Sequence, residues 1–264
     1  MLSLLANSVI SLTFGYQSAL ERVFRLIHPA YANFLPFDAF ISFSTIRAAH
    51  LPGLPYNTIG LFAYDDLNIH PVDKLLLDTG LPGPPAPYCI LDLIAHEPSL
   101  IIPSRLFIPH EGSNRKEAFL QRTDMLPIFF ARSDGGFGVR IDSNADFDML
   151  LDSPTRVTAH SLKVLLHLIN YPSYEKQIQL RNTAASPVSS RRLARLIASK
   201  VSYIVKEAAR ENASIVHWTN PRWKMGSGAG RISVADIELM GIVFVSRGKV
   251  TPLLRVRSDF VFAT

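Results

Sequence analysis

The stretch IELMGIVFVSRGKVTPLLRVR, residues 237–257, is the part of the sequence that most clearly defines the fold. It consists of two apolar runs, rich in β-branched residues, on either side of a turn at Gly248. Two such runs joined by a short turn that contains glycine are typical of a β-hairpin. We therefore predict that the chain ends in an antiparallel hairpin, and that the C-terminal half consists of helices packed on an antiparallel sheet.

The helices of that half are predicted from apolar residues at helical spacing. The longest pattern covers Ser189–Ala213, with Ser189 or Ser190 as the N-cap. A second helix is predicted over Thr158–Asn170, because Leu162, Leu165, Leu166 and Ile169 would form one buried stripe. A further hairpin is predicted for residues 127–141, PIFFARSDGGFGVRI, where Ser133 to Gly136 supply the turn.

The N-terminal half is predicted to contain short strands and helices. The strands are expected at Ser8–Phe14, Thr58–Tyr64 and Tyr88–Ile94, and the helices at Tyr16–Ile27, Phe37–Ala49 and Asn114–Gln121. In residues 1–95 this order of strand, helix, strand and late strand resembles a ubiquitin-type β-grasp, without any family motif behind the resemblance. The resemblance implies a protein-interaction module. The whole chain is predicted to be α+β.

Charge divides the chain into two parts. Residues 1–150 contain 10 Lys and Arg against 15 Asp and Glu, whereas residues 151–264 contain 17 against 7. We predict an acidic, strand-rich domain or subdomain over residues 1–153 and a basic helix-plus-hairpin domain over residues 154–264. Such asymmetry suggests an anionic partner for the basic part. The alternative is that the acidic part neutralises the basic part within one molecule or within a homo-oligomer.

Composition excludes several classes of protein. With 48% hydrophobic and 19% charged residues, the 264-residue chain can bury a core. Its single cysteine, Cys89, excludes an intramolecular disulfide and a cysteine-based zinc site, and we expect this side chain to be buried. No uninterrupted apolar run approaches the roughly 18 residues that a membrane span needs. We expect an intracellular protein, cytoplasmic or nuclear.

Metal and nucleophile chemistry find little support in the sequence, and we expect neither a metal nor a cofactor. His160 and His167 would lie about 10 Å apart on the predicted helix, too far for one ion, and are expected on its solvated face with Lys163. The run Asp142–Asp148 begins like a calcium loop but has Phe147 and Ser153 where Gly and Glu are needed. It is predicted to start a helix capped by Ser143 or Asn144, or else to dock a basic partner. No G-x-S-x-G motif occurs.

The most unusual loop is HWTNPRWKMGSGAGR, residues 217–231. Its glycines do not predict a nucleotide cradle, because a strand rather than a helix is expected after them. Arg222, Lys224 and Arg231 could instead contact phosphates, and Trp223 could stack on a base, whereas Trp218 is expected in the core. The other candidate anion-binding residues are Arg191, Arg192 and Arg195 on the long helix and Arg255 and Arg257 on the last strand.

These observations predict a non-enzymatic intracellular binding protein whose basic C-terminal surface meets an anionic partner, most simply a single-stranded nucleic acid. A protein partner or a second copy of the chain is compatible with the acidic part. The alternative is a small-molecule enzyme whose site lies between the two halves, with His217, Arg222 and Trp223 at its rim.

Overall fold

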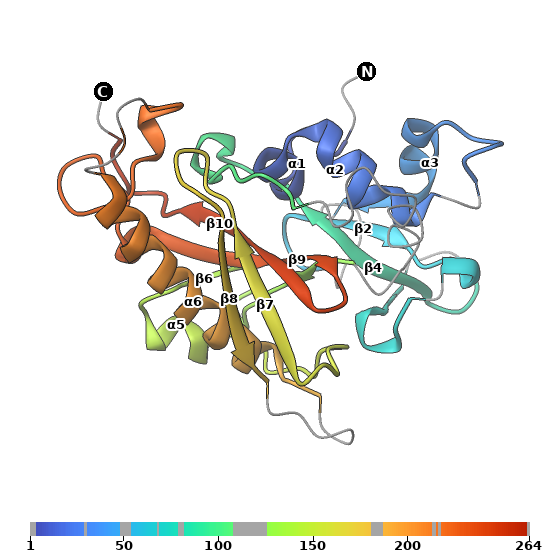
Figure 1. Ribbon diagram of the computed structural model, residues 1–264. Coiled ribbons are helices and arrows are strands. Elements are labelled where there is room, and N and C mark those ends of the chain that lie inside the picture. The colour runs from blue at the N-terminus through green and yellow to red at the C-terminus, as the bar shows by residue number, and fades with distance from the viewer. Residues whose placement is uncertain are drawn as a thin grey trace.

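The computed structural model describes residues 4–28, 31–47, 54–67, 69–78, 82–107, 126–180, 187–212, 215 and 218–262. These residues form a mixed α+β fold with one four-stranded and one six-stranded sheet, as the sequence predicts. In Figure 1 the N-terminal helices and the smaller sheet occupy one end of the molecule, and the larger sheet with its long helix occupies the other.

The six-stranded sheet is built around the predicted C-terminal hairpin. Strands β9 (Ile237–Ser246) and β10 (Lys249–Val256) pair antiparallel across a turn of two residues. β10 also pairs, in parallel, with β7 (Ser161–Leu166), and β7 pairs antiparallel with the edge strand β8 (Tyr174–Gln179). The sheet order is β5-β9-β10-β7-β8, with β6 also on β9.

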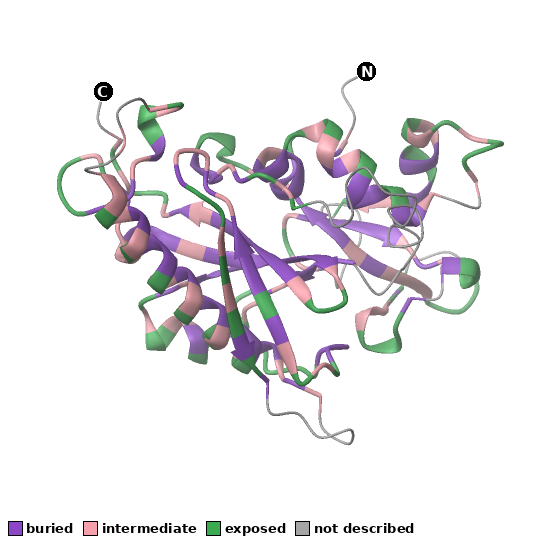
Figure 2. Cartoon of the chain, in the orientation of Figure 1, coloured by how far each residue is buried: buried purple, intermediate pink, exposed green. Residues whose placement is uncertain are grey.

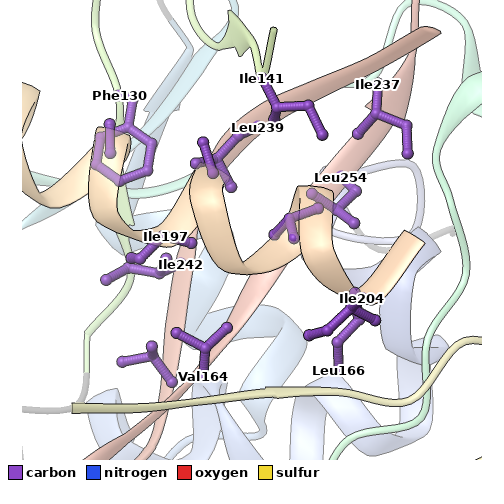
Figure 3. Close-up of a cluster of buried hydrophobic side chains, with 14 of the residues drawn as sticks. Phe130, Ile141, Val164, Leu166, Ile197, Ile204, Ile237, Leu239, Ile242 and Leu254 are labelled. Carbon is purple, nitrogen blue, oxygen red and sulfur yellow. The ribbon is translucent and has the colours of Figure 1, made fainter. Parts of the chain in front are cut away.

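Helix α6 (Ser190–Glu211) lies across one face of this sheet, and its prediction is confirmed. The Ser189 hydroxyl accepts a hydrogen bond from the Arg192 amide at 3.4 Å and so caps the first turn. Figure 3 shows Ile197 and Ile204 of the helix in one cluster with strand residues that include Leu239 and Leu254. This packing buries the apolar stripe of α6 and leaves its opposite face to solvent.

The central hairpin is covered on both faces. Leu239, Ile242 and Leu254 belong to the hydrophobic cluster under α6, whereas Met240, Val243 and Leu253 belong to a second cluster with the N-terminal helices. The two strands are accordingly almost continuously purple in Figure 2. Burial on both faces explains why residues 239–245 and 252–254 contain no polar side chain instead of alternating apolar and polar ones.

The four-stranded sheet is antiparallel, with the order β1-β2-β4-β3. Its strands are β1 (Thr45–Arg47), β2 (Thr58–Phe62), β3 (Leu75–Leu77) and β4 (Ala86–Leu93). The helices α1 (Val9–Phe14), α2 (Tyr16–Arg22) and α3 (Phe37–Ser44) gather beside it in Figure 1. Short 3-10 turns occur at Phe24–Ile27, Asp65–Leu67, Pro71–Asp73 and Pro98–Leu100.

The predicted strand at Ser8–Phe14 is wrong, because these residues form α1. Five of the six residues of α1 are buried, including the polar Ser11 and Thr13. The segment therefore has no solvent-exposed face whose spacing would distinguish a helix from a strand. The strand-first order that suggests a β-grasp is therefore not formed. Cys89 on β4 is buried as predicted, with 1% of its surface exposed.

The predicted helix at Thr158–Asn170 is also wrong, because β7 occupies its centre. The leucines that fit a helical stripe also fit a strand in which four of the six residues are buried, and pairing with β10 and β8 decides between them. His160, Lys163 and His167 therefore do not share a helix face. The predicted helix at Asn114–Gln121 lies outside the described residues.

The segment 127–141 turns where predicted, but both of its arms pair with the same strand. β5 (Ile128–Phe129) lies against Ile242 and Gly241, and β6 (Val139–Arg140) lies against Leu239 and Glu238. The intervening residues leave the sheet edge and return, closed by a bridge between Ala131 and Phe137. Helix α5 (Asn144–Asp148) follows, and Ser143 caps it by accepting from the Asp146 amide, as predicted.

Within the described part of the chain, no helix combines the length and the apolar character that crossing a membrane requires.

Candidate anion-binding surface

The solvent face of α6 carries most of the exposed positive charge of the helix. The 22 residues of α6 include six basic and two acidic side chains. Arg192, Arg195, Lys206 and Arg210 are all exposed, and at 3.6 residues per turn they lie on one side of the helix. From Arg192 to Arg210 this stripe is about 27 Å long, because each residue adds about 1.5 Å. We call these four residues the α6 stripe.

An aromatic side chain lies in the middle of the α6 stripe. Tyr203 is 45% exposed and occupies the same helix face. The ammonium group of Lys176, on the edge strand β8, lies 4.3 Å from the centre of its ring. Neither residue is among the positions predicted from the sequence, although the helical periodicity that places Arg192 and Arg210 also places Tyr203 between them.

Acidic residues neutralise part of the surface at the start of α6. Arg195 pairs with Asp148 at 2.7 Å, and Arg191 lies 3.9 Å from Asp152. The Arg191 guanidinium also donates to the carbonyl of Leu150 at 2.9 Å, so Arg191 holds the end of α5 against α6. Arg192, in contrast, is exposed and forms no ion pair with any described residue. Of the three predicted arginines, Arg192 is therefore the most available for a partner.

At the other end of α6 the surface continues into Arg231. The Cδ of Arg231 and the Cβ of Ala209 both lie within 4 Å of the position that a Cβ on Gly226 would occupy. Arg231 therefore lies beside the last turn of the helix, where it is exposed and has no ion-pair partner among the described residues. It therefore lies on the flank of the helix next to the α6 stripe, near Ala209. Within the stripe, Arg210 has Glu207 as its own partner.

The loop that carries Arg222, Lys224 and Arg231 is held by side-chain hydrogen bonds. Asn170 donates to the carbonyls of Asn220 at 2.7 Å and Trp223 at 3.1 Å, and Asn212 donates to the Met225 carbonyl at 2.6 Å. The Tyr171 hydroxyl accepts from the Met225 amide at 2.7 Å. The glycine run after Met225 leads through the 3-10 turn Val234–Asp236 into β9, so a strand follows it, as expected.

The aromatic residues of this loop face the protein's own cations. Trp223 is only 7% exposed and packs edge-to-face on Phe262. Arg222 lies 3.6 Å above the Phe262 ring and donates to the Ser99 carbonyl at 2.9 Å. Lys224 lies 4.5 Å above the ring of Trp218, which is half-buried against the core. The stacking role of Trp223 stays a prediction, and the buried ring gives it no support.

The two arginines near the end of the chain have acidic partners. Arg255 donates to Glu238 at 2.7 Å, and Arg257 lies 3.1 Å from Asp236 and 3.3 Å from Asp259. The neighbours of Arg255, Leu254 and Val256, face α6, so Arg255 points away from that helix. The structure therefore does not add Arg255 to the α6 stripe.

The remaining predicted positions concern a catalytic or metal site. His217 lies outside the described residues. Nowhere in the described ranges do three or more His, Cys, Asp or Glu side chains gather as ligands for an ion. Asp142, Asp146 and Asp148 do not form a loop around a cation, because they pair with Arg140, Arg132 and Arg195 respectively.

Comparison of the chain with models of protein families, with curated proteins and with solved structures gave no significant match.

Proposed function

We propose that this chain is a non-enzymatic intracellular protein that binds single-stranded nucleic acid along the solvent face of α6. The observation that carries the proposal is the α6 stripe, in which Arg192, Arg195, Lys206 and Arg210 share one exposed helix face. Arg231 adds a further exposed cation beside the last turn of the helix.

The shape of the surface favours a polymer over a compact anion. The stripe is about 27 Å long, and successive phosphates of one strand are about 3.4 Å apart along the helix axis of B-form DNA. Several phosphates can therefore lie along the helix at once, whereas a single phosphate or carboxylate would contact one cation. Tyr203, 45% exposed between the basic residues, offers the ring face opposite Lys176 for stacking with a base.

The ion pairs within the surface limit the affinity that this proposal implies. Asp148 and Glu207 already compensate Arg195 and Arg210, so a phosphate must compete with these carboxylates. Arg192, Lys206 and Arg231 have no such competitor among the described side chains. We expect binding to be moderate and to depend strongly on salt.

The alternative, a small-molecule enzyme with His217, Arg222 and Trp223 at the rim of its site, stays a prediction. Arg222 and Trp223 are engaged with Phe262 and with each other, at 5.6 Å from guanidinium to ring in the latter pair. These contacts give no support to a site between them.

The test is fluorescence anisotropy with a labelled 30-nucleotide oligo(dT) at several salt concentrations. The triple variant Arg192→Gln/Lys206→Gln/Arg210→Gln removes three charges from the stripe. We expect its affinity at low salt to fall at least about tenfold, and the slope of log K against log salt to decrease by about 2, since each phosphate contact contributes about 0.7.

The matched control is Arg47→Gln/Lys74→Gln/Arg105→Gln, which removes the same charge from positions outside α6. We expect it to retain most of the affinity. Equal losses in the two triple variants would mean that net charge alone attracts the oligonucleotide. Absence of binding by the unaltered chain at 50 mM salt would overturn the proposal.

A further inference from the structure

A cavity of about 570 Å³ lies where the two sheets meet. It is bordered by the end of β4, the loop 132–137 and the end of β10. This volume is within the range of about 300 to 1,000 Å³ that is usual for small-molecule sites. The cavity contains no residue of α6, so a ligand bound in it would be independent of the proposed nucleic-acid binding.

Apolar side chains form the floor of the cavity. These residues are each less than 9% exposed, and they come from both halves of the chain: Val9, Leu93, Leu100, Ile101, Phe137 and Met240. Polar side chains, in contrast, are half-buried or exposed and form the rim. A ligand would therefore place an apolar group inward and its polar groups toward the opening.

One cation on the rim is held in place with donors to spare. Glu238 takes one edge of the Arg255 guanidinium, at 2.7 Å from Nε and 2.5 Å from Nη2. The guanidinium has five N–H groups, so Nη1 is left for a ligand. The second arginine, Arg132, is engaged by Asp134 on one edge at 3.1 and 2.8 Å and lies 3.8 Å from Asp146 on the other side.

One acid on the rim has no partner among the described residues. Glu97 is exposed, and no described residue forms an ion pair or hydrogen bond with its side chain. Asp134, in contrast, already accepts from Arg132 and from the Gly136 amide at 3.1 Å. The described rim therefore presents one available carboxylate, Glu97, and two guanidinium groups with N–H donors to spare, Arg255 and Arg132.

The histidine in the cavity is fixed as part of the wall. His96 forms a hydrogen bond with the side-chain oxygen of Asn57, and its ring stacks on Tyr56 at 5.8 Å between centres and 19° between planes. Asn57 has the left-handed backbone conformation, with a φ of 65°. Because the partner of His96 is an amide instead of a carboxylate, the arrangement is suited to shaping a wall and lacks the orienting acid of a catalytic triad.

We propose that this cavity binds a small zwitterion, namely a di- or tripeptide with an apolar side chain. The ligand ammonium group would pair with Glu97, its carboxylate would pair with Arg255, and its apolar side chain would lie on the floor. A purely anionic ligand would leave the Glu97 carboxylate without a partner, and a purely cationic one would leave the spare guanidinium donors of Arg255 and Arg132 unused. A ligand with both charges matches both kinds of group.

The test is isothermal titration calorimetry of the full chain with the dipeptide Leu-Phe, with its N-acetyl derivative and with its C-terminal amide. We expect each derivative to bind at least about tenfold more weakly than the free dipeptide, because each has lost one charged hydrogen-bonding group. The variant Glu97→Gln should weaken the free dipeptide by a similar factor and leave the N-acetyl derivative unaffected. Asp65→Asn, at another exposed acid outside the cavity lining, is the matched control.

A second variant tests the location independently. Ser258 is exposed on the rim, so Ser258→Trp fills the opening without disturbing the core, and circular dichroism verifies that the fold is retained. We expect this variant to lose binding of all three ligands. Lack of heat with the free dipeptide at millimolar concentration, unchanged binding in Ser258→Trp, or an equal effect of Glu97→Gln on the N-acetyl derivative would each overturn the proposal.

Discussion

The Arg156 guanidinium donates a hydrogen bond of 2.8 Å to the carboxylate of Asp73, which is 83 residues away in the sequence. The Arg156 side chain is 4% exposed and also donates to the Leu126 carbonyl, while its guanidinium carbon lies 5.0 Å from the centre of the Phe244 ring. Asp73 belongs to the 3-10 turn before β3, so this pair connects the smaller sheet with the larger one.

Replacing Asp73 with Asn should destabilise the protein by about 3 kcal/mol, because it removes a hydrogen-bonded counter-charge from a buried guanidinium. We expect urea denaturation to show this loss. The matched control is Glu207→Gln, which breaks the exposed pair with Arg210 on α6 and should change the free energy of unfolding by less than about 0.5 kcal/mol. Similar effects in both variants would contradict a special role for the buried pair.

Asp92 on β4 should make stability depend on pH. Its carboxylate is buried, and burial raises the pKa of Asp92 to about 7, although the amides of Leu93 and Ile10 donate to it at 2.7 and 3.2 Å. A raised pKa means that the folded protein holds this proton more tightly than the unfolded chain does. Stability should therefore decrease as the pH rises from about 4 to about 7, and then level off.

The variant Asp92→Asn tests this expectation. It should remove that decrease, which is on the order of 4 kcal/mol for a shift of this size. Chemical denaturation of both proteins at pH 4.5 and pH 8 measures the difference. Parallel pH profiles for the two proteins would show that Asp92 ionises in the folded state as easily as in water.

Cys89 should be unreactive in the folded protein. It is 1% exposed, and burial raises the pKa of its thiol to about 12, so almost no thiolate is present at pH 8. Mass spectrometry after treatment with iodoacetamide should show no adduct on the native chain and one adduct after denaturation in urea, since the sequence has a single cysteine. Rapid native labelling would contradict the burial of β4.

Gly241 on β9 should not tolerate a side chain. A Cβ at this position would lie 2.6 Å from the Ile128 carbonyl oxygen and 3.1 Å from the Phe129 Cα, so β5 would have to move. We expect Gly241→Ala to destabilise the protein by about 2 kcal/mol in thermal or chemical unfolding. Gly248→Ala, in the turn where nothing lies within 4 Å of the added methyl group, is the control and should cost less than about 1 kcal/mol.

The elements that could be predicted are helices with one solvent-exposed face and hairpins whose turn contains glycine. α6 alternates apolar and basic residues at helical spacing over 22 residues, and the β9–β10 hairpin has Gly248 at its turn. In α1 and β7 most residues are buried, so apolar character carries no periodicity and the choice between helix and strand depends on neighbours far away in the sequence.

The candidate surfaces could be predicted only in part, for a different reason. The cations of the α6 stripe follow from helical geometry alone. Helical geometry does not predict which of these cations are neutralised, because Asp148, the partner of Arg195, comes from α5, 47 residues earlier. The cavity could not be predicted at all, since its lining runs from Val9 to Ser258 and only the tertiary fold brings these residues together.

The position of β9 and β10 near the end of the sequence affects how the chain folds during translation. Because this hairpin supplies Leu239 and Leu254 to one hydrophobic cluster and Met240 and Leu253 to the other, neither cluster is complete without it. During translation both would remain open until residues 237–256 have emerged from the ribosome. The apolar segments before the hairpin therefore stay exposed to solvent until then. A chain whose translation stops before residue 237 would be a substrate for chaperones or proteases.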